Sequence, residues 1–386
     1  MLSRPLPMHS QIQRLSSVYF DREYHFRKGS KIAARAAPFP FPEEIRLPDK
    51  GGMNVQKFRF LTLFAAVLLL GLSGCAYVQV PLFTPVQPMQ EKVLEGQGDA
   101  KILLIEVSGV ISEQEKQKKM GFTEDVSLVA QIKEELQKAE KDKAVSGILL
   151  KIDSPGGTVT ASDMIYHELV KFKKRTGKRI TACIMGLGTS GGYYIACAAD
   201  EIIAHPTALT GSIGVIAMKM NVHGLLEKVG IRNETFKSGD KKDLLSPFRA
   251  TSPEEFQIMQ TIINQLHKRF VDVIADGRNG QIKRAAVEKL ADGRIYTADQ
   301  ALENRLIDKI GYLDDAIAHI KKELKLTEAK IIVYLRPGSY KGSIYSSYPA
   351  STSSWPMGGA ANLLPMGSEV FSSAPQVKFM YLWSPW

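Results

Sequence analysis

The segment "GLGTSGGYYIACAAD", residues 186–200, places one serine between a threonine and two glycines, directly ahead of a run of small apolar residues. The apolar segment "RITACIM" precedes it, so Ser190 is predicted to lie where a strand ends and a helix begins. A serine at such a junction is most often an N-cap in a tight turn. It can also be a nucleophile, because the free amides at the start of a helix stabilise negative charge.

Strand-like and helix-like segments alternate on both sides of this junction. Strands are predicted at residues 101–111, 145–153, 179–185 and 330–337, and helices at residues 126–143, 160–175 and 253–276. Such alternation builds right-handed βαβ units and a largely parallel sheet that helices cover on both faces. The sequence therefore predicts an α/β fold.

A second glycine-rich strand end occurs in "KIDSPGGTVT", where Gly156 and Gly157 follow a buried strand and precede a helix. Adjacent glycines let a backbone approach a ligand closely, although "PGG" alone is more often only a turn. The ends of parallel strands meet at one edge of a sheet, where ligands bind. If Ser190 attacks an acyl carbon, the amide of Gly191 is placed to hold the oxyanion, and "PGG" offers the second donor that such sites need.

A serine nucleophile also needs a base. The histidines lie outside any recognisable triad context: His167 fits a surface helix and His205 a strand end. The segment "TFKSGDKKDLLSPF" offers a lysine instead, although burial would have to lower its pKa by about 3 units, near 4 kcal/mol. Spacing does not choose among Lys237, Lys241 and Lys242, and for each of them a solvated surface position is the default.

A membrane-targeting pattern begins at Met53, with a short basic part, a largely apolar run of thirteen residues at 60–72, and "LSGC" at 72–75. A spanning helix needs about 20 apolar residues and a secretory signal only about 7 to 15. The "LSGC" segment resembles the bacterial lipobox, which predicts a lipid on Cys75 and removal of the preceding peptide. An uncleaved anchor is the alternative. Both place the rest of the chain outside the cytoplasm, at a bacterial membrane surface.

Composition and periodicity divide the chain into five segments. Residues 1–52 lack periodicity and are interpreted as a non-native extension before the true start at Met53, with a disordered leader as the alternative. The predicted segments are this extension (1–52), a signal or anchor (53–75), a tether (76–98), a catalytic domain (99–336) and a flexible Ser/Gly/Pro-rich tail (337–386). The terminal "VKFMYLW" is expected to return as an added strand or to dock on a neighbour.

Two function classes are disfavoured. The net charge of +10 is concentrated before residue 60, and no basic run has interleaved aromatics, so nucleic-acid binding is not expected. The three cysteines form no CxxC pair and the seven histidines no metal-binding spacing, so no metal or other cofactor is expected.

Three separated motifs, "DSPGG", "GTSGGYYIACAADEIIAHPTALTGSIGV" and "KSGDKKDLLSPFR", occur in an order and with gaps that resemble the short form of bacterial signal peptide peptidase A. That family consists of Ser–Lys proteases with the ClpP/crotonase-like fold of repeated ββα/βαβ units. The resemblance covers about residues 100–335 and implies a single catalytic domain. It implies Ser190 as the nucleophile, Lys242 as the general base, and Gly157 and Gly191 as the oxyanion donors.

The resemblance also implies a membrane-associated serine endopeptidase that degrades cleaved signal peptides and other hydrophobic peptides through an acyl-enzyme, without a cofactor. In the family's long form the lysine and the serine come from different copies, so a one-copy chain is expected to assemble its site between protomers of a homo-oligomeric ring. Arg305 stands where the family commonly has glycine, which predicts strain in one turn. The alternatives are a non-catalytic ClpP-like membrane scaffold and a crotonase-type acyl-CoA enzyme; export and the serine disfavour the latter.

Overall fold

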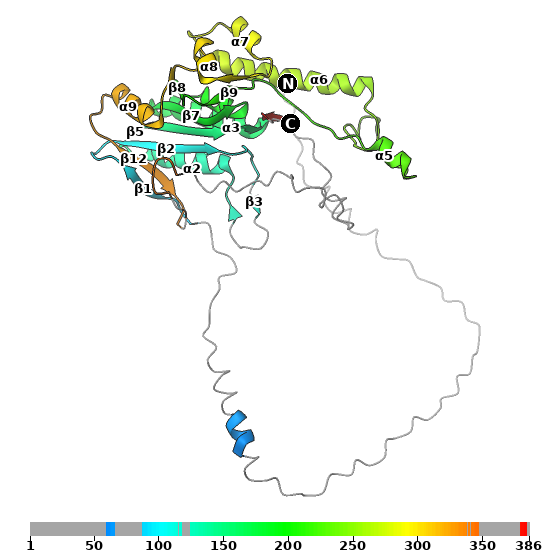
Figure 1. The fold of residues 1–386 in the computed structure, drawn as a ribbon, viewed down its shortest axis with the longest axis horizontal. Helices are drawn as coiled ribbons and strands as arrows, with labels where there is room; N and C mark the ends of the chain where they lie inside the picture. Colours follow the sequence, from blue (N-terminus) through cyan, green and yellow to red (C-terminus); the bar gives the residue numbers. More distant parts are fainter. Residues whose placement is uncertain are drawn as a thin grey trace, which may run out of the picture. The chain divides into compact units, whose positions relative to one another are not determined.

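A computed structural model gives the structure of the protein (Figure 1). It describes residues 59–65, 87–114, 116–117, 124–337, 339, 341–346 and 379–383. The chain divides into two units, residues 1–79 and 80–386, and the described residues of the first unit, 59–65, are helical. Among the described residues, no helix combines the length and the apolar character needed to cross a bilayer. The predictions for residues 1–52, the lipobox and Cys75 lie outside the described residues.

A nine-stranded sheet forms the centre of the described part of the second unit. Its main path runs through β1 (Gln90–Glu95), β12 (Lys330–Leu335), β2 (Lys101–Ser108), β5 (Val145–Ser154), β7 (Arg179–Thr189), β8 (Glu201–Ala204) and β11 (Lys309–Ile310). From β12 to β11 every neighbouring pair is parallel, and only β1 on this path runs antiparallel to its partner. The predicted, largely parallel α/β sheet is confirmed.

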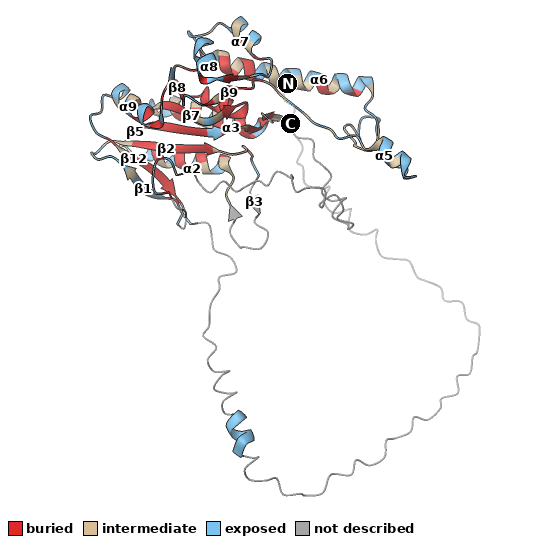
Figure 2. Cartoon of the chain, viewed as in Figure 1, coloured by how far each residue is buried: buried red, intermediate tan, exposed pale blue. Residues whose placement is uncertain are grey.

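Helices cover both faces of this sheet. Successive strand residues point to opposite faces, so Leu103 and Ile105 of β2 join an apolar cluster with α2 (Leu128–Lys141) and α3 (Val159–Thr176). Ile102 and Leu104 join the cluster that contains α9 (Leu313–Glu323) on the other face. Figure 2 shows the buried residues concentrated in these strands. Burial on both faces explains the continuous apolar runs of the strand sequences.

Several further elements are short or lie outside the main path of the sheet. They are β6 (Gly156–Thr158), α4 (Gly191–Ala196), β9 (Leu209–Gly211), α5 (His223–Lys228), α6 (Pro253–Gly277), α7 (Arg284–Leu290), β10 (Ile295–Thr297) and α8 (Ala298–Glu303). A separate two-stranded pair consists of β3 (Lys116–Gln117) and β4 (Glu124–Asp125). The strand β9 pairs with β7 and β10, and α5 extends away from the sheet with its flanking loops (Figure 1).

The elements expected from periodicity occur at the expected places, with ends that shift by a few residues. One segment differs from the expected outline, and the strand expected near the end of the chain is present. Residues 90–95, within the segment expected to be a tether, form β1 and pair with β12. Near the end of the chain, β13 (Met380–Leu382) pairs antiparallel with β6, so the C-terminal strand joins the segment that carries the "PGG" glycines.

The strain expected at Arg305 is confirmed, because this residue has a φ of 59°. It follows the C-cap of α8, and Leu306 N donates to Ala301 O at 2.8 Å while Arg305 N donates to Leu302 O at 2.9 Å. This bonding pattern is a Schellman motif, in which glycine is the preferred residue at the left-handed position. A residue with a side chain costs about 1 kcal/mol there.

Arg305→Gly is therefore expected to raise the free energy of unfolding by about 0.5–1 kcal/mol in urea. Arg305→Ala is the matched control, because it also removes the exposed hydrogen bond from the side chain to Gln281 O but keeps the strained backbone. If the glycine variant is no more stable than the alanine variant, the strain at this turn is negligible.

Candidate active site

Ser190 lies at the junction between β7 and α4, as the sequence predicted. Its backbone has φ 53° and ψ −115°, a conformation that costs free energy for any residue with a side chain and that clusters at functional sites. The hydroxyl is buried, does not cap α4, and has no hydrogen-bond partner among the described residues. Ser190 is thus the N-cap residue of α4 by position, but its side chain makes no capping hydrogen bond. The geometry is that of a sharp strand-to-helix turn that presents a serine hydroxyl.

The two glycine-rich strand ends converge at this point. The strands β5 and β7 are neighbours, and Ser154 is in register with Gly188. A methyl group added to Gly191 would lie 3.2 Å from the Gly157 nitrogen, and one added to Gly156 would lie 2.8 Å from the Gly191 nitrogen. The amides of Gly157 and Gly191 therefore lie together beside Ser190. Because α4 has only six residues, its macrodipole is small, and these individual amides are the main groups that could stabilise negative charge beside Ser190.

The C-terminal strand β13 lies directly on these glycines. Tyr381 is paired with Gly157 in the antiparallel register. A methyl group on Gly156 would lie 2.0 Å from the Tyr381 carbonyl oxygen, and one on Gly191 would lie 3.1 Å from it. Glycine at residue 156, with φ of 102°, is therefore what allows the carbonyl of Tyr381 to approach the two amides.

Hydrogen bonds hold β13 from both sides. On one side Trp383 N donates to Pro155 O at 2.9 Å, beyond the pairs with β6. On the other side Met380 N donates to Ile216 O at 3.0 Å, and Ile216 N donates to Met380 O at 3.1 Å. An extended segment clamped between two backbones is the arrangement by which proteins bind a peptide as an added strand.

The side chain of Tyr381 fills a pocket whose walls come from α4 and α6. It is fully buried, with its ring centroid 5.1 Å from that of Tyr194 and 4.6 Å from that of Phe270. Its hydroxyl donates to Leu266 O of α6 at 2.8 Å. Burial raises the pKa of Tyr381 well above its usual range, so the phenol stays neutral. The pocket therefore fits a large apolar or aromatic side chain.

A cavity of about 320 Å³ follows on the other side of the Tyr381 carbonyl, where Leu382 lines it. Residues 212–216, residues 291–293 and the α6 side chains Ile263, Asn264 and His267 form its other walls. His267 Nε2 lies 2.8 Å from Ala291 O. Sequence reasoning missed this histidine and the Tyr381 pocket, because only tertiary contacts bring these residues to the site. The apolar segment "VKFMYLW" indicates a strand but not where that strand pairs.

The three candidate lysines differ in their contacts. Lys237 Nζ lies 2.9 Å from Asp243 Oδ1, and Lys241 Nζ lies 2.5 Å from Glu254 Oε2. The side chain of Lys242 makes no hydrogen bond or ion pair with any described residue. All three lysines are exposed, so the burial expected for a lysine base is absent within one chain. The unpartnered Ser190 hydroxyl likewise has no lysine within hydrogen-bond distance among the described residues.

Comparisons with known proteins place the chain among peptidases. The model of "Peptidase family S49" matches residues 172–327 and that of "Clp protease" residues 112–210. The chain is 42% identical over 245 residues to the "Putative signal peptide peptidase SppA" of Enterococcus faecium, a match that covers 64% of this chain and 70% of that protein.

Two longer relatives match over part of their length. "Protease 4" of Salmonella typhi is 34% identical over 200 residues, which cover 52% of this chain and 32% of that protein. "Serine protease SPPA, chloroplastic" of Arabidopsis thaliana is 31% identical over 259 residues, 66% of this chain and 37% of that protein. The chain thus spans about a third of the length of these two proteins.

Proposed function

The chain belongs to peptidase family S49 and has its Clp-protease-like α/β fold, and from this premise we propose that it is a serine endopeptidase with Ser190 as nucleophile and Lys242 as general base. One observation carries the proposal. The chain's own C-terminal strand pairs with β6 and brings the Tyr381 carbonyl close to Gly191, the residue after Ser190 with its unpartnered hydroxyl, which supports the binding of a peptide substrate in the same place.

The proposed chemistry follows from this placement. The Ser190 Oγ attacks the carbonyl carbon of the residue bound in the position of Tyr381, and its proton passes to the neutral amine of Lys242. The oxyanion accepts hydrogen bonds from the amides of Gly157 and Gly191. The lysine then gives the proton to the leaving nitrogen as the peptide bond breaks, which leaves an ester on Ser190. Water, deprotonated by the same amine, attacks the ester; the bond to Ser190 Oγ breaks, the ammonium returns the proton to this oxygen, and the acid is released.

A neighbouring copy of the chain is proposed to supply the lysine. Within one chain Lys242 is exposed and lies outside hydrogen-bond distance of Ser190, and an amine works as a base only when it is desolvated. The arm formed by residues 216–256 also exposes large apolar side chains, with Phe236 at 97% exposure. Packing of these arms in a homo-oligomeric ring would cover this apolar surface and bury the lysine. The exposed members are Ile216, Met218, Met220, Leu225, Val229, Ile231, Phe236, Phe248 and Phe256.

The proposed substrates are cleaved signal peptides and other hydrophobic peptides, bound in extended form with a large apolar side chain in the Tyr381 pocket. This pocket and the name of the Enterococcus relative support that class. We propose an extracytoplasmic catalytic domain held at a bacterial membrane through the signal segment, with a lipid on Cys75 or with an uncleaved anchor. A scaffold without activity gives no reason for the strained, unpartnered Ser190.

Deletion of residues 379–386 tests the proposal. Because β13 is attached to the chain, its effective concentration at the site is high, and it competes with added peptide. The shortened chain is expected to cleave an apolar fluorogenic peptide about tenfold faster than the full chain when the peptide is well below millimolar concentration. A serine-directed phosphonate is expected to stop both reactions.

One result would contradict the peptidase proposal, and a different result would contradict the placement of β13 in the substrate position. If neither chain cleaves peptides under conditions where both are folded and assembled, the peptidase proposal fails. If both chains cleave at the same rate, β13 does not occupy the substrate position in solution. Thermal unfolding of both chains serves as the control for folding.

A further inference from the structure

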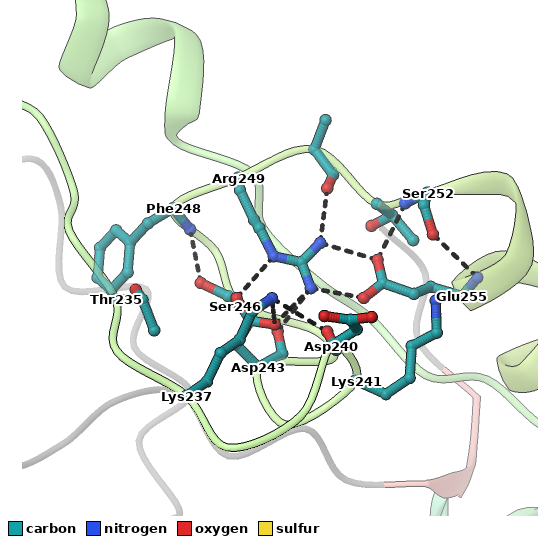
Figure 3. A network of polar contacts seen from close by, with 12 residues as sticks. Thr235, Lys237, Asp240, Lys241, Asp243, Ser246, Phe248, Arg249, Ser252 and Glu255 are labelled. Atoms are coloured by element: carbon teal, nitrogen blue, oxygen red, sulfur yellow. Dashed lines mark hydrogen bonds and ion pairs between the residues drawn. The ribbon is translucent and has the colours of Figure 1, made fainter.

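A network of charged side chains fixes the loop next to Lys242 to the first turn of α6 (Figure 3). At its centre is Arg249, whose Nε and Nη2 each lie 2.8 Å from an oxygen of Asp243. The same guanidinium donates through Nη1 to Glu255 Oε2 at 2.8 Å. Three further bonds use the remaining donor capacity: Nη2 donates to Glu255 Oε1 and to Asp243 O at 3.2 Å, and Nη1 donates to Ala250 O at 3.0 Å. One planar cation therefore joins two carboxylates and the backbone between them.

The α6 end of this network is rigid. Glu255 is 2% exposed and is the third residue of α6, where it completes a capping box with Ser252. Its Oε2 accepts from Ser252 N at 3.0 Å, and Ser252 Oγ accepts from Glu255 N at 3.2 Å. A carboxylate fixed in this way gives Arg249 a stable attachment point on the helix that also forms the Tyr381 pocket.

The loop end of the network is strained. Leu245, three residues beyond Lys242, has a φ of 68°, which is unfavourable for a branched side chain. Such a conformation persists only where surrounding contacts determine it. Besides the backbone bond from Ser246 N to Asp243 O at 2.9 Å, the contacts near Leu245 include those of Arg249 with the carboxylate and the carbonyl of Asp243, the residue that follows Lys242.

The network also decides which charges face Lys242. Asp243 is adjacent to it in sequence, and a free carboxylate there would form an ion pair with the ammonium and stabilise its protonated form. Instead Asp243 is held by Arg249 and by Lys237, whose Nζ lies 2.9 Å from it. Lys241 is held in turn by Glu254. Besides Lys242, the titratable and charged groups of residues 235–255 are Lys237, Asp240, Lys241, Asp243, Arg249, Glu254 and Glu255, and Lys219 packs against them by donating to Arg249 O at 3.0 Å.

We propose that Arg249 is the positioning residue of the general base: its guanidinium holds the Lys242 loop on α6 and keeps the Asp243 carboxylate away from the Lys242 amine. This inference rests on the proposed function, in which Lys242 acts on the substrate of a neighbouring protomer. Arg249 itself touches no reacting atom. Only arginine spans both carboxylates, because lysine presents a single compact cation.

The two carboxylates stay ionised at any pH useful for an assay. Arg249 holds the pKa of Asp243 well below its usual range, with Lys237 as the second cause. Arg249 also lowers the pKa of Glu255 to about 2, helped by the backbone N–H of Ser252. A change in the pH–rate profile near neutral or alkaline pH therefore reports another group, and Lys242 is the group that the proposal names.

The test compares Arg249→Met, Arg249→Lys and the double variant Arg249→Met/Asp243→Asn in full pH–rate profiles on an apolar peptide. Arg249→Met is expected to lower kcat about 10- to 100-fold with little change in KM, because the base is misplaced. The pH at which activity rises is also expected to increase by about one unit, because the freed Asp243 carboxylate stabilises the protonated form of Lys242. In the double variant, the pH at which activity rises is expected to return to the wild-type value while kcat stays low. Arg249→Lys is expected to lower kcat without changing the pH at which activity rises.

Controls separate this inference from the proposed function. Lys242→Ala must be inactive, and if it is active the choice of base fails before Arg249 is considered. Arg284, which pairs with Asp272 and Glu288 on the surface, is the matched control, and Arg284→Met is expected to leave kcat and the pH profile unchanged. Light scattering reports the assembly of each variant. The inference is overturned if Arg249→Met has a wild-type kcat and pH profile, or if its loss of activity is fully explained by loss of assembly.

Discussion

Ser190→Ala is expected to lower kcat on an apolar peptide by a factor on the order of 10⁴ or more, with no loss of folding stability. The size of the loss is typical of removing the nucleophile from a serine protease. Stability is expected to hold because the hydroxyl makes no hydrogen bond with the described part of the chain, so its removal breaks no native contact. Steady-state kinetics measures the loss of kcat, and urea unfolding of the same preparation measures the folding stability.

Lys242→Ala is expected to give a loss of similar size, because the serine hydroxyl then has no acceptor for its proton. Lys268→Ala is the matched control: this exposed lysine pairs with Asp272 on α6, and its removal is expected to leave kcat unchanged. Activity retained by Lys242→Ala would assign the base to another group. Activity retained by Ser190→Ala would remove the serine mechanism altogether.

Mixing the two inactive variants is expected to restore activity. In a ring assembled at random from equal amounts of Ser190→Ala and Lys242→Ala chains, about a quarter of the sites combine an intact serine with an intact lysine from the next chain. Co-expression of the two variants should therefore give about a quarter of the wild-type activity per chain. This expectation rests on the Ser190 hydroxyl, which has no hydrogen-bond partner and therefore no lysine partner among the described residues of its own chain.

The control for this experiment is co-expression of Ser190→Ala with the double variant Ser190→Ala/Lys242→Ala, which has no intact serine and must stay inactive. If both groups came from the same chain, the first mixture would be inactive as well. An active monomer, seen by light scattering during the assay, would also contradict assembly of the site between copies.

Local patterns in the sequence predicted most of the sheet and the position of Ser190 between a strand and a helix. The apolar runs at β2, β5 and β7 are long because helices cover both faces, and this same burial makes them visible in the sequence. The approach of the "PGG" glycines to Ser190 followed from two neighbouring parallel strands that end at one edge. Strain at Arg305 followed from a single residue that lacks the conformational freedom of glycine.

Long-range contacts were not predictable in the same way. Tyr381 reaches Gly157 only through pairing of two short strands that are far apart in the sequence, and three-residue strands leave too little pattern to define a register. The same holds for β1, which lies in a polar, proline-containing segment and becomes a strand only by pairing with β12. The contacts of Arg249 depend on the turn at Leu245, which periodicity does not describe.

The central claim is that the Ser190 oxygen becomes bonded to the acyl group during cleavage. Peptide mapping by mass spectrometry, after the chain lacking residues 379–386 reacts with a fluorophosphonate, tests it most directly. One phosphonyl group per site is expected on Ser190, with labelling abolished in Ser190→Ala and strongly slowed in Lys242→Ala. An adduct on a different residue, or equal labelling of the Ser190→Ala chain, would contradict the account.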